Sequence, residues 1–158
     1  MRTLMLFCLF VGFSALPSQG RTQSATEKAC RAGIFPALEK GRFSGSIDCR
    51  RDQLEIRKAG EIRSGSRAFQ IYDYRYRLAP ICPKCAIHGG QRIIILSAGR
   101  YIGQYKPDSA QVSVERNTLV LSPRSGAEEY GKASAINFGP NGPPNRIQFD
   151  GEEMSLFR

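Results

Sequence analysis

The chain has 158 residues, a length that suits one ordinary domain with a hydrophobic core of its own. Its formal net charge is +9, but the Lys and Arg residues are spread along the chain rather than gathered in a long block. A nucleic-acid-binding function is therefore not expected. The positive charge points instead to an acidic protein or an anionic envelope polymer as the partner.

Residues 1–20 predict a cleavable signal peptide. Arg2 gives a positive start, residues 4–13 are apolar apart from one glycine, and Ser18-Gln19-Gly20 places small residues where a signal peptidase cuts. The apolar run has about ten residues, too few for a membrane span, which needs roughly 20. We therefore expect cleavage near Gly20 and a periplasmic or secreted domain over residues 21–158, with no transmembrane anchor. Its charge would be +8, since Arg2 is the only charged residue removed.

The first part of the mature chain predicts one or two short helices. Ser24 and Glu27 have the spacing of a capping box, and Gly33 would end that helix. Pro36 to Lys40 predicts a further turn of helix, with proline at its start and Gly41 at its end.

From residue 44 onward, the apolar residues follow a period of two, which is typical of strands. Strands are expected over residues 45–49, 53–58, 67–78, 92–97, 101–105, 111–115, 118–121, 134–138, 146–149 and 152–157. Turns are expected at Ala59-Gly60, Ala98-Gly99, Arg116-Asn117, Ser125-Gly126 and Asp150-Gly151. Many short strands joined by close turns predict a mainly β fold, a small antiparallel barrel or sandwich.

The expected strand 67–78 has large side chains on both faces. Phe69 and Ile71 would lie on one face, while the tyrosines at 72, 74 and 76 and Leu78 would lie on the other. This predicts either a bulge in the strand or a strand buried on both sides. Its arginines would share a face with Asp73.

The same strand carries the candidate binding residues. Tyr and Arg are enriched at binding hot spots, and in an exported protein they could contact sugar rings or acidic groups. The alternative is that the tyrosines fill the core. The candidates are Tyr72, Tyr74, Arg75, Tyr76 and Arg77.

Four cysteines remain after signal cleavage, and an even number in an exported chain indicates disulfides. Their pairing is left open by the sequence. The candidates are Cys30, Cys49, Cys82 and Cys85.

The C-x-x-C motif at Cys82 and Cys85 has three interpretations. As a redox pair it would use Lys84 to favour a thiolate, and as a zinc site it would add His88, the only histidine of the chain. No βαβ pattern surrounds the motif, and no second ligand pair completes a zinc site. Structural disulfides are therefore favoured over either alternative.

Catalytic patterns are not evident elsewhere in the sequence. There is no G-x-S-x-G motif, and the pairs Glu128-Glu129 and Glu152-Glu153 would point to opposite faces of a strand. No cofactor is expected. The sequence favours a small, basic, exported binding or accessory module, such as an inhibitor or an envelope-associated protein, over an enzyme. The alternative is a redox or zinc-binding protein that uses Cys82, Cys85 and His88.

Overall fold

The computed structural model describes residues 33–43, 53–80, 82–124 and 132–158. The expected signal peptide, Cys30, Cys49, the expected helix before Gly33, the expected strand 45–49 and the turn at residues 125–126 lie outside these ranges. Within them, no helix is long and apolar enough to cross a membrane.

The described chain is mainly β, as the sequence predicts, with one short helix and nine antiparallel strands. In chain order these elements are α2 (Phe35–Lys40), β1 (Gln53–Ser64), β2 (Arg67–Arg77), β3 (Gly89–Ser97), β4 (Arg100–Tyr105), β5 (Gln111–Glu115), β6 (Thr118–Ser122), β7 (Ser134–Ile136), β8 (Arg146–Phe149) and β9 (Glu152–Ser155).

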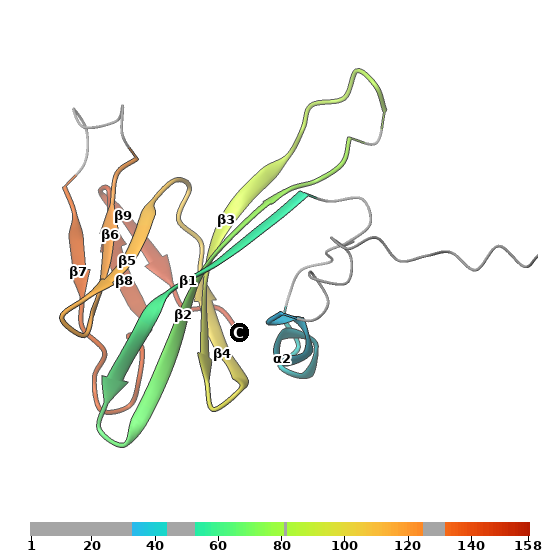
Figure 1. Ribbon diagram of the computed structural model, residues 1–158. Helices are drawn as coiled ribbons and strands as arrows, with labels where there is room; N and C mark the ends of the chain where they lie inside the picture. Colours follow the sequence, from blue (N-terminus) through green and yellow to red (C-terminus); the bar gives the residue numbers. More distant parts are fainter. Residues whose placement is uncertain (1–32, 44–52, 81, 125–131) are drawn as a thin grey trace, which may run out of the picture.

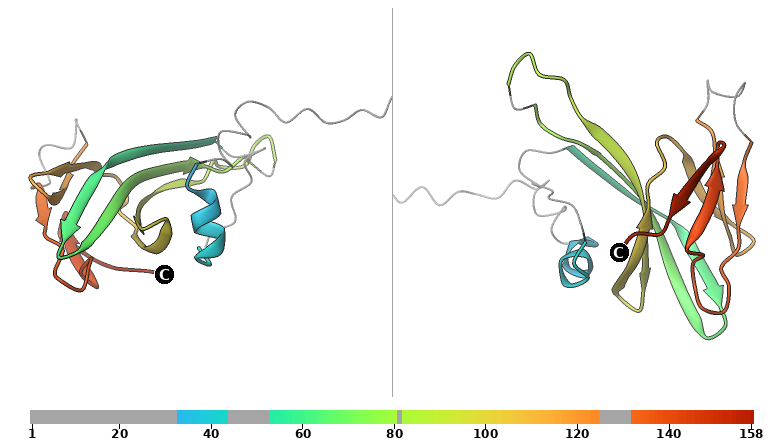
Figure 2. Two further views of the ribbon diagram at one scale, coloured as in Figure 1. Left: turned by 60° about the horizontal axis from the view of Figure 1, so that its bottom comes forward. Right: turned by 180° about the vertical axis from the view of Figure 1, so that it is seen from behind.

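The strands form two layers. Strands β1 to β4 make a four-stranded sheet in chain order, while β5-β6-β7 and the β8-β9 hairpin form the second layer. Figures 1 and 2 show this second layer against one face of the four-stranded sheet and α2 beside the other face. Phe157 is joined to β4 by two backbone hydrogen bonds with Gln104, of 2.8 and 2.9 Å. The arrangement is sandwich-like, one of the two architectures that the sequence predicts.

Each face of the four-stranded sheet covers its own hydrophobic cluster. Phe69 and Ile71 pack between the two layers, together with residues of β3, β5, β6, β8 and β9. Tyr74 packs on the opposite face with Ile94 and Leu38 of α2. Strand β2 is therefore buried on both sides, the second of the two alternatives predicted for it.

The bulge lies in the neighbouring strand. The pairing of β1 with β2 shifts register between Lys58 and Gly60, whereas the pairing of β2 with β3 is regular. The turn predicted at Ala59-Gly60 is therefore wrong, because β1 continues through this point as a bulged strand. The hairpin turn follows at Gly65-Ser66, where Gly65 has a φ of 58°.

Three predicted two-residue turns are confirmed. Both residues have positive φ in Ala98-Gly99, Arg116-Asn117 and Asp150-Gly151, as tight hairpins require. The Asn117 side chain also accepts a hydrogen bond from Arg63 N (2.6 Å) and donates one to Arg63 O (2.7 Å). This turn therefore ties the edge strand β1 to the second layer.

Helix α2 agrees with the prediction for Pro36 to Lys40. Proline stands in its first turn, and the Gly41 N–H bonds to the Ala37 carbonyl at its end. Phe35 and Leu38 are its buried residues, so this short helix is held by packing on the sheet.

Candidate functional site

A cavity of about 530 Å³ opens at one end of the four-stranded sheet, where β1 begins, β2 ends and β3 begins. We call it the arginine cavity. Its lining residues are Gln53, Leu54, Glu55, Arg75, Tyr76, Arg77, Ile87, Gly89, Gly90, Gln91, Asp108, Ser109 and Arg124.

The charged groups around this cavity are mixed, with an excess of cations. Arg75, Arg77 and Arg124 carry positive charge, and Glu55 and Asp108 carry negative charge. Arg77 and Arg124 are exposed, whereas the Arg75 side chain is 21% exposed. The local charge has the same sign as that of the whole chain.

Asp73 forms the centre of a polar network beneath the cavity. Its carboxylate is 4% exposed and accepts hydrogen bonds from three side chains. The donors are Gln91 Nε2 at 2.6 Å, Arg75 Nε at 3.2 and 3.3 Å, and Arg57 Nη2 at 3.4 Å. A buried carboxylate needs such partners, because burial without them would strongly disfavour its charge.

The network also holds the segment between β4 and β5 to the sheet. The Ala110 N–H donates to Gln91 Oε1 (2.8 Å), and the Ala110 carbonyl accepts from Gln91 Nε2 (2.9 Å) and Arg75 Nη2 (2.7 Å). Arg57 Nη2 reaches the Val112 carbonyl at 2.9 Å. The guanidinium of Arg75 is thus fixed by both a carboxylate and a backbone carbonyl.

Two glycines allow the sheet to pack closely at the edge of the cavity. A Cβ atom on Gly89 would lie 2.6 Å from the Tyr76 carbonyl oxygen, and one on Gly90 would lie 2.9 Å from the Tyr76 hydroxyl. That hydroxyl accepts a hydrogen bond from Arg92 Nη2 (3.0 Å), and the guanidinium also lies 5.3 Å from the ring centroid. The Tyr76 side chain is therefore held at the cavity by Arg92 and packs closely against Gly90.

The five candidate binding residues do not form one patch. Arg75, Tyr76 and Arg77 line the arginine cavity, whereas Tyr72 and Tyr74 do not. Tyr74 is fully buried, with its ring centroid 6.5 Å from that of Phe35 in α2. For Tyr74, the core interpretation is the one that the structure supports.

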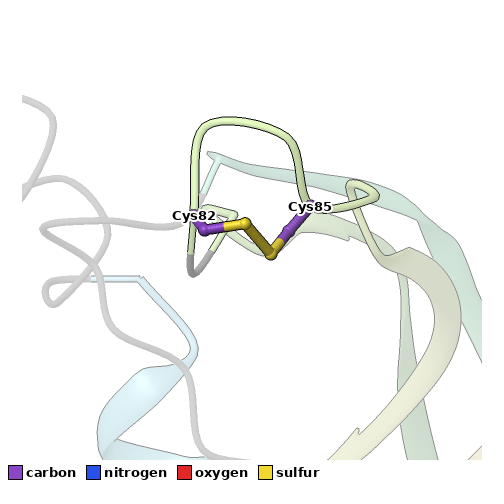
Figure 3. Close-up of a disulfide and its surroundings, with 2 residues drawn as sticks. All are labelled: Cys82 and Cys85. Atoms are coloured by element: carbon purple, nitrogen blue, oxygen red, sulfur yellow. A yellow bond between two sulfur atoms is a disulfide. The ribbon is translucent and has the colours of Figure 1, made fainter.

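Cys82 and Cys85 are bonded to each other (Figure 3), which joins two of the four disulfide candidates. Both residues are exposed, and no helix follows them before β3 begins. Since the two sulfurs share a bond, neither is a free thiolate for zinc. Across the described residues, no group of three or more metal-ligating side chains is found, with His88 included in the search.

Sequence reasoning missed several residues of the site. Arg57, Gln91 and Arg124 belong to no local motif, and for Asp73 the sequence predicts only a face shared with the arginines of its strand. The hydrogen bonds of Arg57, Asp73 and Gln91 join positions that lie 16 to 55 residues apart. The sequence gives only a weak signal for Gln91, which stands beside the charged Arg92 just before the apolar run 93–96 of β3.

Comparison with known proteins gives no relative from which a function could be transferred. No family model matches the chain, and searches of curated proteins and of solved structures found no significant match. The function is therefore inferred from the geometry of the site.

Proposed function

We propose that this protein is a small exported binding module whose arginine cavity takes a carboxylate group from an acidic protein partner. The observation that carries the proposal is the presence of Arg75, Arg77 and Arg124 around one cavity, with Arg75 held by a buried network. The proposed role is accessory or inhibitory and involves no reaction.

The fixed position of Arg75 favours binding. Its Nε and Nη2 groups are engaged by Asp73 and by the Ala110 carbonyl, while Nη1 has no hydrogen-bond partner in the described part of the chain. A guanidinium that is already ordered loses less side-chain entropy when it meets a ligand. Arg77 and Arg124 are exposed and can then complete the contact with a carboxylate. The planar guanidinium of arginine can donate two parallel hydrogen bonds to the two oxygens of a carboxylate.

An acidic protein fits the surroundings better than an anionic polymer. Ile87 lines the cavity and is 65% exposed. Among the described residues, two large apolar side chains are exposed, Ile87 and Phe157, and Ile87 is the more exposed of the two. An apolar anchor next to arginine is typical of protein interfaces, where hydrophobic and charge-assisted contacts occur together. A polymer of charged sugars would make little use of an isoleucine.

A titration with a fluorescent acidic peptide tests this proposal. The probe has six glutamates around one leucine, and its binding is followed by anisotropy at low ionic strength. Arg77→Ala should weaken binding about five- to tenfold, because it removes a charge-assisted contact. The matched control is Arg100→Ala, which removes the same charge from an exposed arginine at the start of β4, at the opposite end of the sheet. This control should change the affinity less than twofold.

The titrations distinguish a cavity site from general charge attraction, and a protein partner from an anionic polymer. Equal losses in the two variants would show only general charge attraction and would contradict a cavity site. A second probe lacking leucine, together with Ile87→Ser, tests the choice of partner. If both probes and a polygalacturonate chain bind equally well, and Ile87→Ser has no effect, the protein partner is wrong and the polymer is favoured.

A further inference from the structure

The connection between β2 and β3 forms an arm that projects away from both layers of the sandwich (Figures 1 and 2). Its base is closed by a hydrogen bond from the Leu78 N–H to the His88 carbonyl, 2.7 Å long. All residues from 82 to 88 are exposed, and none of them belongs to either hydrophobic cluster. The Cys82–Cys85 disulfide lies within this exposed arm (Figure 3).

We propose that Cys82–Cys85 is a thiol–disulfide exchange site, which accepts electrons from a dithiol while the sandwich stays folded. This inference does not depend on the proposed binding function. The bond links residues only three positions apart, and in the chain-entropy model the stabilisation by a disulfide falls as the closed loop shortens. A bond that closes so short a loop, outside both cores, contributes little to holding the fold.

The surroundings of the disulfide favour attack by a thiolate. Exchange requires that an anionic sulfur reach the bond, and both cysteines are exposed. Lys84 lies between them and is exposed, and the sequence has no acidic residue between Asp73 and Asp108. The cavity at the base of the arm is lined by the two carboxylates Glu55 and Asp108 as well as by three arginines. The positive charge of Lys84 stabilises both the approaching and the departing thiolate.

A dithiol reductant supplies the two electrons that the exchange requires. One of its thiolates attacks a sulfur of the pair, forms a mixed disulfide and expels the other cysteine as a thiolate. The second thiol of the reductant then attacks the mixed disulfide, which releases the reductant as its own disulfide. Two electrons pass to the arm, and two protons from the reductant or solvent complete the two thiols.

The test uses the full mature chain without denaturant. The protein is incubated with graded dithiothreitol, quenched with iodoacetamide and analysed by peptide mass mapping, which reads each of the four cysteines separately. Oxidised glutathione serves as the unhindered reference disulfide. We expect Cys82 and Cys85 to become alkylated at a rate at least equal to reduction of the reference, with no change in the near-ultraviolet circular dichroism.

Variants test the role of the Lys84 charge and the small contribution of the disulfide to the stability of the fold. Lys84→Glu should slow the reduction at least threefold relative to Lys132→Glu, which makes the same charge change at another exposed lysine outside the arm. The double variant Cys82→Ser and Cys85→Ser should unfold at the same urea midpoint as the parent. The proposal is overturned if the pair reacts only at urea concentrations that unfold the sandwich, or if reduction or the double variant disrupts the fold. Equal rates in the two lysine variants would exclude the role of Lys84.

Discussion

At the scale of single residues, Asp73 is the group on which the arginine cavity depends. It is buried and accepts hydrogen bonds from Gln91, Arg75 and Arg57. The sequence could place Asp73 on the same face as Arg75, because alternation along a strand fixes the face. It could not pair Asp73 with Gln91, 18 residues away, because that contact depends on the register of β2 with β3.

Removing this carboxylate should strongly destabilise the protein. In Asp73→Ala, the buried Gln91 amide and the Arg75 guanidinium each lose one of their two acceptors, since both also donate to the Ala110 carbonyl. Breaking a buried charge pair typically costs about 3–5 kcal/mol, and because the Arg75 side chain is 21% exposed, we expect a cost near the lower end of this range. Urea unfolding measures the change. The control is Glu61→Ala, which breaks an exposed pair with Arg63, its side chains being 33% and 79% exposed, and should cost less than about 1 kcal/mol. Equal costs would contradict the network.

The stability of the protein should fall at alkaline pH because of Tyr101. Burial raises the pKa of its hydroxyl to about 12, although the nearby Arg92 cation lowers it in part. The unfolded chain releases this proton near pH 10, whereas the folded chain retains it. The contribution of Tyr101 to the free energy of unfolding is therefore fully present below pH 10. Between pH 10 and pH 12 this contribution falls by about 1.4 kcal/mol per pH unit.

Tyr101→Phe isolates this effect. The Tyr101 hydroxyl is buried and has no hydrogen-bond partner in the described part of the chain, so the variant should have nearly parental stability at pH 7. Above pH 10 its free energy of unfolding should fall less steeply than that of the parent. Burial also raises the pKa of Tyr105, so part of the decline should remain. Identical pH profiles, measured by urea unfolding from pH 8 to pH 11.5, would rule out this cause.

At the scale of elements, most strands could be predicted and the long first hairpin could not. The ranges of β5 and β8 agree with the prediction, since each is bounded by a two-residue turn with a clear sequence signal. Strand β1 was predicted to stop near Lys58 because Ala59-Gly60 resembles a turn. The chain instead forms a bulge there, and Gly60 packs closely against Val114 of β5.

The contact at the bulge gives a direct prediction. A Cβ atom on Gly60 would lie 2.5 Å from the Val114 Cβ, so Gly60→Ala must displace β1 from β5 and should cost about 1–3 kcal/mol. Gly139→Ala is the matched control, since a Cβ there meets nothing within 4 Å, and should change stability by less than about 0.5 kcal/mol. The unfolding free energies from urea titration decide between them. A neutral Gly60→Ala would show that the two strands are not in close contact.

At the scale of the whole molecule, the described chain forms two layers of strands, one helix and a projecting arm, and one end of the four-stranded sheet borders the arginine cavity. The period-two pattern could predict two apolar faces on β2, and hence a layered β fold. The position of the cavity could not be predicted, because it depends on the β4–β5 segment folding back onto the sheet through Gln91 and Ala110. The sequence shows the C-x-x-C motif, but it does not predict the arm that carries this motif, because the projection of the arm depends on the long β2–β3 pairing.

Binding of an acidic partner at the arginine cavity can be located residue by residue in solution. The measurement is backbone amide NMR of the 15N-labelled protein, titrated with the glutamate-leucine peptide. We expect the largest shift changes to cluster at four residues that line the cavity, Gly89, Gly90, Gln91 and Ser109. Shift changes centred on Gly99 and Arg100 at the opposite end of the sheet, or spread evenly over the exposed arginines, would contradict it.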